Sequence, residues 1–444
     1  MIIRLLSGFF ILFTLFVADI SAHSVSNTAA RPARRAESAF NNLNRWYNVS
    51  TGTWDSTGWW NNANIVTMVG NLAKADPENY RLQLRARVIF ALAFRRAPAK
   101  NPQPIAAVIG NGSLALFKGT KYAVGYDKYS DAHTHEPHTH FPPNWLAIRN
   151  NHMPNNPSDF DLSAFNETAL LSPASSNPEP WLNGFYDDNL WWSLAWISAY
   201  DLTRHKHYLH LAQNIFLAMT KMWPTHCHNG GIYWSWKRDY VNAITNELFF
   251  STAAHLANRA HKKSEREFYF DWAERALEWF VRSGMINAEG TINDGLTEGC
   301  ANNNGTVWSY NQGVIIGGLV EMHRATARTA ANETYLSLAK SIAHAALRQL
   351  SDADGVLHDP CEPNCGADGT QFKGVFMRGL QKLQEVAPDE VFKNAIRRSA
   401  ESVWWNDRED GVFSVNWAGP FVYPANASTH SSAMEALVAD VAVG

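Results

Sequence analysis

Apolar residues recur with a helical period along most of the chain, and runs that alternate as strands do are scarce. One class of segment has an apolar stripe opposite a charged face, as in residues 271–283, where Trp272, Trp279 and Phe280 share one side. Segments of this class cover residues 34–47, 80–96, 207–222, 266–283, 333–350 and 389–404. The pattern predicts helices that show one face to water.

A second class of segment is rich in Gly, Ala, Asn and aromatic residues and predicts helices buried on all sides. These segments begin near Trp59, Asp187, Asn242, Trp308, Gln371 and Thr429. Successive starts differ by 128, 55, 66, 63 and 58 residues, and four of these gaps fit one helical hairpin with its loops. Six hairpins predict an all-α fold, an (α/α)6 toroid forming a single catalytic domain over residues 23–444. An open α-solenoid is the alternative.

The long first gap contains a Pro- and Asn-rich insertion at about residues 97–180 that has little periodicity. A loop of this length in a compact domain is a functional lid, a disordered insertion or an error in the gene model. It contains Glu136 and four histidines, His133, His135, His138 and His140. Short His-rich tracts can bind metals, but nothing in the sequence orients these rings, so we interpret the tract as a polar loop and assign no metal.

The amino end predicts export from the cell. Residues 1–22 combine a basic start at Arg4, an apolar run over residues 5–18 and a small residue, Ala22, at a plausible cleavage position. The run, about 14 residues long, is too short to span a bilayer, and the carboxyl end lacks a lipid-anchor signal. We therefore expect a secreted protein, free or associated with the cell wall, with no membrane span.

Composition narrows the function classes. The 444 residues include 38 Lys+Arg and 41 Asp+Glu, a formal charge of −3, which does not suit a nucleic-acid-binding face. An apolar content of 46% excludes a disordered chain. The 18 tryptophans exceed what core packing alone suggests, and flat indole faces also match the C–H faces of sugar rings. These features favour a protein that handles carbohydrate. We expect it to be a monomer.

Four cysteines in an exported chain predict disulfides. Of the three possible pairings we favour Cys361–Cys365 and Cys227–Cys300; a zinc site is the weaker interpretation, because no Cys-x-x-Cys spacing is present. N-glycosylation sequons begin at Asn48, Asn111, Asn166, Asn304, Asn332 and Asn426.

The strongest chemical signal is the acid pair Asp187 and Asp188, which opens a predicted helix between Tyr186 and two tryptophans. Helix capping would explain one acid but not two among aromatic residues. Retaining glycosidases need two carboxyl groups about 5–5.5 Å apart, one as nucleophile and one as acid/base. Neighbouring Cα atoms lie about 3.8 Å apart, so adjacent side chains can reach that separation. The pair therefore predicts glycoside chemistry.

The starts of the other buried helices carry amides, an acid, a lysine and aromatic residues. At one end of a toroid these side chains would form a sugar-binding cleft, in which amides bond hydroxyls and aromatic rings stack on sugar faces. The predicted substrate-binding residues are Trp59, Asn62, Asn64, Tyr186, Trp191, Trp192, Asn242, Asn246, Asp294, Tyr310, Asn311, Gln312 and Lys373.

The chain resembles glycoside hydrolase family 76, the endo-α-1,6-mannanases, between about residues 184 and 417. The resemblance is carried by residues 186–192, 230–234, 242–248, 294–296, 310–313 and 372–374, with Cys300. It implies an (α/α)6 fold, cleavage of α-1,6-mannan with retention, Asp187 as nucleophile, Asp188 as acid/base, and no cofactor. The insertion at 97–180 departs from the family pattern.

Two other functions stay open at this stage. One is a cell-wall transglycosidase that acts on the mannose core of glycolipid anchors and passes the sugar to another glycan. The other is a non-catalytic mannan-binding protein that uses the same cleft. The intact acid pair favours the hydrolase over the binding protein.

Overall fold

The computed structural model describes residues 31–102, 171, 176–327 and 332–444. In the described part of the chain, six helices form an inner ring: α2 (Trp59–Ala75), α6 (Tyr186–Thr203), α8 (Ala243–Ala257), α10 (Ser309–Ala325), α13 (Phe372–Val386) and α15 (Ala427–Val443). The outer helices are residues 31–43, α3 (Tyr80–Arg96), α7 (Lys206–Thr220), α9 (Lys263–Arg282), α11 (Asn332–Leu350) and α14 (Glu390–Trp405).

The remaining elements are short. They are η1 (Asn44–Trp46), β1 (Tyr47–Asn48), β2 (Thr53–Trp54), η2 (Ala97–Lys100), η9 (Glu179–Trp181), η10 (Cys227–Asn229), α12 (Gly366–Gly369), β3 (Arg408–Glu409) and β4 (Val412–Phe413). β1 pairs with β2 and β3 with β4, both antiparallel. The predicted scarcity of strands is confirmed.

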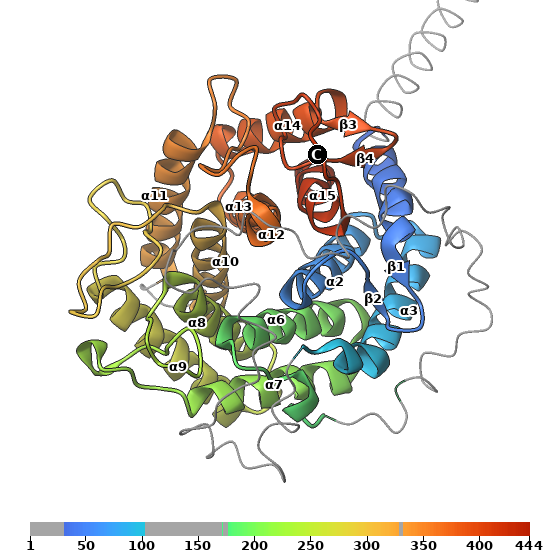
Figure 1. The fold of residues 1–444 in the computed structure, drawn as a ribbon. Coiled ribbons are helices and arrows are strands. Elements are labelled where there is room, and N and C mark those ends of the chain that lie inside the picture. Colours follow the sequence, from blue (N-terminus) through green and yellow to red (C-terminus); the bar gives the residue numbers. More distant parts are fainter. Residues whose placement is uncertain (1–30, 103–170, 172–175, 328–331) are drawn as a thin grey trace, which may run out of the picture.

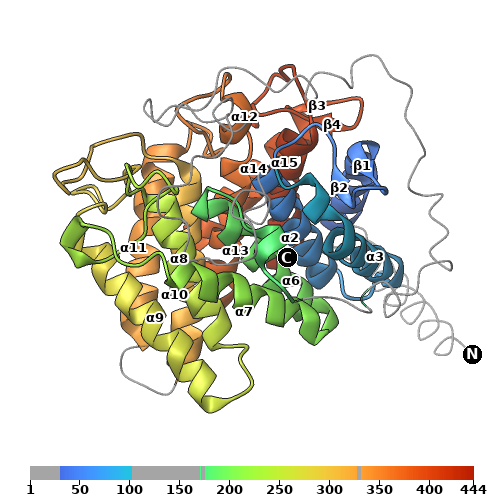
Figure 2. The same cartoon turned by 60° about the horizontal axis from the view of Figure 1, so that its bottom comes forward.

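The inner ring is closed (Figure 1). α2 contacts α6, α6 contacts α8, α8 contacts α10, α10 contacts α13, α13 contacts α15, and α15 contacts α2 again. The tilted view shows the outer helices lying against this ring (Figure 2). Because the first and last inner helices touch, the predicted (α/α)6 toroid is confirmed and an open solenoid is wrong.

All six inner helices run in the same direction, because each hairpin reverses the chain twice before the next inner helix begins. Their carboxyl ends line one cavity of about 530 Å³. Its lining includes Lys74 of α2, Asp201 of α6, His255 of α8, Glu321 of α10, Lys382 of α13 and Val441 of α15. The six amino ends therefore meet at the opposite end of the ring, which we call the N-terminal rim.

Burial matches the two helix classes. Every residue of α8 is buried, whereas α9 buries one stripe that includes Tyr269, Ala273 and Trp279. The inner helices also approach closely. A Cβ atom on Gly313 of α10 would lie 2.4 Å from the Cα atom of Phe376 in α13, so only glycine fits there.

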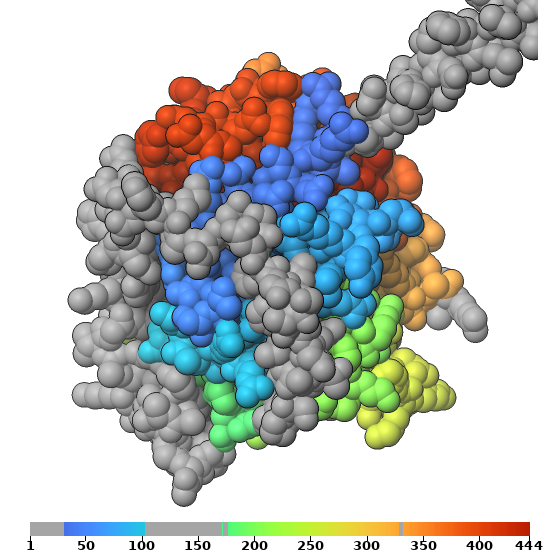
Figure 3. All heavy atoms as spheres, turned by 90° about the vertical axis from the view of Figure 1, so that its right-hand side faces the viewer, coloured from blue at the N-terminus to red at the C-terminus, as the bar shows by residue number. Residues whose placement is uncertain are grey.

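The amino-terminal helix completes the outer layer beside the carboxyl-terminal part of the chain (Figure 3). Arg35 forms an ion pair with Glu401 of α14, with Nη1 2.6 Å from Oε1. His430 Nε2 of α15 and the carbonyl oxygen of Ala39 are 2.8 Å apart. Segments far apart in the sequence thus close the ring together.

Both ends of the predicted insertion are described. The Asn101 Nδ2 group donates to the carbonyl oxygens of Pro180 and Leu182, each at 3.0 Å, which joins the two ends directly before α6. The signal peptide over residues 1–22 and the His-rich tract lie outside the described residues. Among the helices of the described part, none has the length and apolarity needed to cross a membrane.

Both favoured disulfides are confirmed, Cys227–Cys300 and Cys361–Cys365. Among the sequons, Asn304 is exposed and both Asn48 and Asn332 are half-buried, while Asn111 and Asn166 lie outside the described residues. Asn426 is fully buried, and its side chain accepts hydrogen bonds from the backbone N–H groups that open α15. The predicted glycosylation at Asn426 is therefore incompatible with the folded chain.

Candidate active site

Asp187 and Asp188 lie in the first turn of α6 at the N-terminal rim. Phe185 occupies the N-cap position with extended backbone, and it offers no capping side chain. Asp187 is half-buried and Asp188 is 3% exposed. Neither acid is the cap of its helix, so capping does not explain the pair.

The chain entering α6 is held on two sides. The Asn189 side chain accepts from the backbone N–H of Asn183 at 2.8 Å and donates to its carbonyl oxygen at 3.3 Å. On the other side, the Tyr186 N–H donates to the carbonyl oxygen of Trp234, and the Trp236 N–H donates to that of Gly184. These contacts fix where the two carboxyl groups point.

The two carboxyl groups have different surroundings. The Trp234 indole N–H donates to Asp187 Oδ2 at 3.0 Å, while the buried Oδ1 accepts no hydrogen bond of normal geometry from the described residues. The Asn183 amide donates to Asp188 Oδ2 at 2.7 Å. Burial and then the charge of Asp188 raise the pKa of Asp187 well above its usual range, and the Trp234 hydrogen bond opposes this. The negative charge of Asp188 therefore disfavours ionisation of Asp187.

Four acidic residues act electrostatically on Tyr310, the second residue of α10. Burial raises the pKa of Tyr310 well above its usual range, and the charges of Asp294, Asp187, Asp368 and Glu247 raise it further. These acids come from α6, α8, α12 and the loop before α10. The structure thus brings the starts of several inner helices to one place, as the toroid predicts.

Asp294 is held by the neighbouring loops. The Tyr240 hydroxyl donates to Asp294 Oδ2, and the Asn303 amide donates to the Tyr240 oxygen at 3.1 Å. The backbone N–H of Ala243, at the start of α8, donates to the Asp294 carbonyl oxygen at 2.8 Å. A positioned carboxylate at this place can accept hydrogen bonds from sugar hydroxyls.

Aromatic rings follow the rim between the acids. The half-buried Trp60 indole stacks on Trp191, with ring centroids 5.7 Å apart, and its N–H donates to Asp368 Oδ1 at 2.8 Å. Tyr310 stacks on Phe372 with centroids 3.8 Å apart. Rings fixed in this way present flat apolar surface beside polar groups, the combination that sugar binding uses.

Three of the predicted sugar-binding amides have another role. Asn62, Asn246 and Gln312 are each the fourth residue of an inner helix, as Asn189 is in α6. Each accepts from the backbone N–H, and donates to the carbonyl oxygen, of one residue in a loop that packs on that helix: Trp54, Ile232 and Ile292 respectively. Because the polar atoms of all three amides are engaged, these side chains hold the loops and do not serve as sugar ligands.

Asn64 and Lys373 were also predicted to bind sugar, and this prediction is wrong because their polar groups have partners within the protein. Asn64 Oδ1 accepts from the Arg378 guanidinium at 2.9 Å inside the ring. Lys373 is 2% exposed, its Nζ lies 2.6 Å from Glu362 Oε1, and it donates to the Val415 carbonyl oxygen. The Asn64 amide oxygen and the Lys373 ammonium group are thus engaged within the protein.

Three predicted aromatic ligands are also buried. Trp59 and Trp192 pack against each other and against Trp181, with centroids 4.7 to 5.9 Å apart, and Tyr186 is 1% exposed. The Trp59–Trp192 cluster belongs to the hydrophobic core. These rings support the rim from below.

Replacing Gln312 with leucine is expected to lower the free energy of unfolding by about 3 kcal/mol, because the backbone groups of Ile292 lose their partner while buried. Activity per folded molecule should stay close to that of the wild type. Urea denaturation and steady-state kinetics measure the two effects. A raised KM at unchanged stability would restore Gln312 as a sugar ligand.

The other predicted residues do meet at the rim: Asp187, Asp188, Asn242, Asp294, Tyr310 and Asn311. Trp191 is 3% exposed and belongs to the hydrophobic core, where its ring supports Trp60. Asn242 Oδ1 and both amide atoms of Asn311 are buried without a hydrogen-bond partner among the described residues. Sequence reasoning missed Trp60, Trp234, Tyr240, Glu247 and Asp368 as site residues. Trp234 and Glu247 lie inside motifs that carry the family resemblance, whereas Tyr240 and Asp368 lie outside those motifs.

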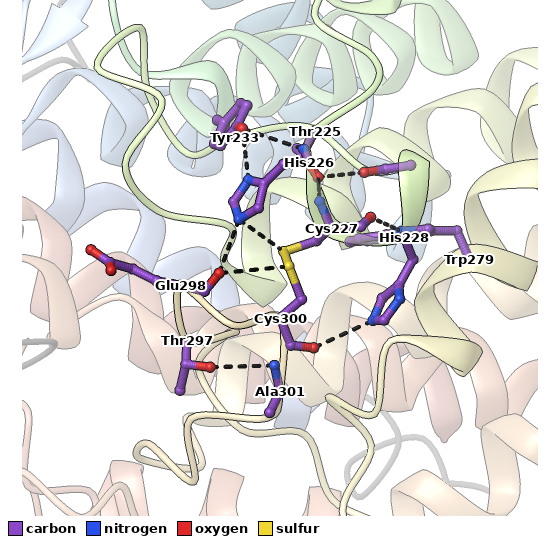
Figure 4. Close-up of a disulfide and its surroundings, with 11 residues drawn as sticks. Thr225, His226, Cys227, His228, Tyr233, Trp279, Thr297, Glu298, Cys300 and Ala301 are labelled. Atoms are coloured by element: carbon purple, nitrogen blue, oxygen red, sulfur yellow. Dashed lines mark hydrogen bonds between the residues drawn. A yellow bond between two sulfur atoms is a disulfide. The ribbon is translucent and has the colours of Figure 1, made fainter.

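The Cys227–Cys300 disulfide joins two loops of the site (Figure 4). One loop leads to Trp234 and the other follows Asp294. His226 Nδ1 lies 2.8 Å from the Tyr233 hydroxyl, and its Nε2 lies 3.1 Å from the carbonyl oxygen of Glu298. His226 and the two sulfur atoms lie within 4.8 Å of one another, but a metal would need thiolates, and both sulfurs are committed to the disulfide.

Replacing Trp234 with phenylalanine is expected to move the acid limb of kcat/KM to higher pH. The lost hydrogen bond favours the ionised form of Asp187, so its removal raises the pKa of Asp187 further and leaves less ionised carboxylate at a given pH. A pH–rate profile measures the shift. Trp405→Phe is the matched control, since Trp405 donates to Glu401 at 2.9 Å on the outer helix α14. An equal shift in both variants, or none in Trp234→Phe, contradicts the prediction.

The chain is similar to curated fungal proteins. It is 28% identical over 219 residues to mannan endo-1,6-alpha-mannosidase DCW1 of Candida albicans, covering 46% of this chain and 47% of that protein. The DCW1 protein of Saccharomyces cerevisiae is 28% identical over 222 residues, 46% of this chain and 47% of that protein. The chain thus spans about half the length of the curated relatives that it matches.

Solved structures share the fold. The Lin0763 protein of Listeria innocua has a TM-score of 0.65 and 18% identity, covering 92% of this chain and 96% of that chain. An inactive variant of the α-1,6-mannanase GH76A of Salegentibacter sp. HEL1_6 has a TM-score of 0.63 and 18% identity, covering 92% and 99%. The model of glycosyl hydrolase family 76 matches residues 166–442, which is more than half of the chain. Motifs, toroid and family match agree: the chain belongs to glycosyl hydrolase family 76.

Proposed function

We propose that this chain is a glycoside hydrolase that cleaves α-1,6-mannosidic bonds within mannan and retains the anomeric configuration. The observation that carries the proposal is the adjacent pair Asp187 and Asp188, held at the N-terminal rim in different surroundings. The curated relatives are named mannan endo-1,6-alpha-mannosidases. The inactive Salegentibacter mannanase, studied with α-1,6-mannotetrose, has two successive aspartates replaced by alanine.

In the proposed mechanism Asp187 attacks the anomeric carbon of a bound mannosyl unit. The bond to the leaving oxygen breaks, and Asp188 gives its proton to that oxygen. Asp188, now ionised, then takes a proton from water, whose oxygen displaces Asp187 and releases mannose-ended product. The mechanism therefore requires an ionised Asp187 and a protonated Asp188 at the moment of attack. The Trp234 hydrogen bond supports this distribution, because it stabilises ionised Asp187.

The experiment is product analysis of the purified full chain on linear α-1,6-mannan. We expect short α-1,6-mannooligosaccharides, and proton NMR should show α-anomers as the first products. Products longer than one sugar at early times identify internal cleavage. Release that requires a second glycan as acceptor would replace the hydrolase with a transglycosidase, and tight mannan binding with no release would indicate a binding protein.

We further propose that the protein acts outside the cell. The signal-like segment over residues 1–22 supports this location, and so do the two disulfides, which persist in oxidising compartments. The sequon at Asn304 lies on the surface, where a glycan can be attached. Detection of the glycosylated chain in culture medium tests this part of the proposal.

A further inference from the structure

Glu247, in the second turn of α8, is a buried acid that lacks the usual compensation. Its side chain is fully buried, and neither carboxyl oxygen has a hydrogen-bond partner among the described residues. Buried carboxyl groups normally have a cation or several donors. Three other buried glutamate side chains of this chain follow that rule: Glu321 with Arg259, Glu362 with Lys373, and Glu435 with Arg378.

The position of Glu247 connects it with the active site. Glu247 lies close enough to Tyr310 and to Asp294 to interact electrostatically with each of them, and Asp187 acts on the same Tyr310. Ser251 and His255 follow it at helical spacing, and His255 lines the cavity at the carboxyl ends of the inner helices, so this side of α8 faces the interior of the ring. Glu247 therefore lies on the inner wall, about one turn below the N-terminal rim.

The surroundings of Glu247 favour the neutral form of its carboxyl group. Burial and the nearby charge of Asp294 raise the pKa of Glu247 well above its usual range. A neutral carboxyl group has one O–H donor and a carbonyl acceptor, and both are unused here. On α10, the fully buried Asn311 adds an unused amide donor and an unused amide acceptor.

We propose that Glu247 contacts the substrate, donating a hydrogen bond to one hydroxyl of the mannosyl unit held over Asp187 and accepting one from a neighbouring hydroxyl. Sugar hydroxyls are both donors and acceptors, so they can satisfy the acid and also the Asn311 amide. A purely structural position would be better filled by an apolar side chain, because an unpaired buried polar group destabilises the fold. The inference rests on the proposed mannanase function.

The test is to compare the Glu247→Leu and Glu247→Gln variants of the full chain with the wild type. Glu247→Leu is expected to keep or raise the Tm, because an unpaired polar group is replaced by apolar atoms, and to lower kcat/KM on α-1,6-mannooligosaccharides by about 10- to 100-fold through the loss of two hydrogen bonds. Glu247→Gln keeps a donor and an acceptor, so it should retain most of the activity. Loss of Tm in parallel with activity, or unchanged activity in Glu247→Leu, would overturn the inference.

A matched control is Glu435→Gln, which changes an equally buried glutamate that is paired with Arg378. Its Tm should fall, in contrast to that of Glu247→Leu. A binding readout separates substrate contact from effects on chemistry: calorimetry with α-1,6-mannotriose should show weaker binding to the Asp187→Asn/Glu247→Leu double variant than to Asp187→Asn. If the wild type cleaves no mannan, the proposed function fails; if it does and Glu247→Leu binds and cleaves equally well, only the role of Glu247 fails.

Discussion

Asp187→Asn is expected to lower kcat on linear α-1,6-mannan by roughly 10⁴- to 10⁶-fold, the loss seen when a covalent nucleophile is removed. The amide has the same shape as the carboxyl, and its oxygen can still accept from the Trp234 indole. The fold should therefore persist, and Tm should stay level or rise because the repulsion between Asp187 and Asp188 is lost. Kinetics and thermal unfolding of the same preparation measure both effects.

The control for this variant is Asp410→Asn. Asp410 is an exposed aspartate in the turn between β3 and β4, and its φ of 50° suits asparagine equally well. It should retain full activity. Comparable activity in Asp187→Asn and Asp410→Asn would contradict the catalytic role assigned to the acid pair.

Added azide distinguishes the two acids. In Asp187→Ala, azide entering from the nucleophile's side should give the β-mannosyl azide. In Asp188→Ala the mannosyl enzyme still forms, so azide should give the α-mannosyl azide, and kcat should fall by roughly 10²- to 10⁴-fold as for a lost general acid. The opposite pair of anomers would exchange the roles of Asp187 and Asp188.

The ring of helices could be predicted from the sequence because it depends on the periodic spacing of apolar residues and of the hairpins. The predicted outer segments 207–222 and 266–283 correspond to α7 and α9, whose bounds differ from the predicted ones by a few residues. Their apolar stripes and the repeat near 60 residues depend on local pattern alone. The acid pair was predictable for a similar reason, since capping could not explain two acids in one turn.

The direction of each side chain could not be predicted. Neighbouring helix positions differ by about 100° around the axis, so Asn246 reaches the Ile232 loop while Glu247 faces the ring interior. Trp59 enters the core and Trp60 reaches the rim for the same reason. If the predicted orientation of a helix is wrong by one residue, a side chain that packs in the core is mistaken for one that faces the site.

Tyr240 and Asp368 could not be predicted as site residues for a different reason. Tyr240 reaches Asp294 across more than fifty residues of sequence, and Asp368 is placed by a single short turn of helix, α12. Neither position shows a periodic pattern. Their contacts follow from how the loops close over the rim, which depends on the whole ring.

Removing that disulfide is expected to have the largest effect on stability. The Cys227→Ala/Cys300→Ala variant should lose about 4 kcal/mol of unfolding free energy, since the bridged cysteines are 73 residues apart and the unfolded chain regains that freedom. The matched control, Cys361→Ala/Cys365→Ala, opens a separation of only 4 residues and should lose about 2 kcal/mol. Urea denaturation of both variants measures the difference.

The two variants should also differ in activity. The Cys227–Cys300 bridge ties the loop that leads to Trp234, whose indole bonds Asp187, to the loop that follows Asp294. Freed loops hold these groups less closely, and a misplacement of about 1 Å can cost 10²-fold in rate. We therefore expect kcat/KM to fall below that of the control at a temperature where both variants are folded. Equal activity in the two variants would mean that hydrogen bonds such as that between Tyr240 and Asp294 position the site without the disulfide. The disulfide would then contribute to stability alone.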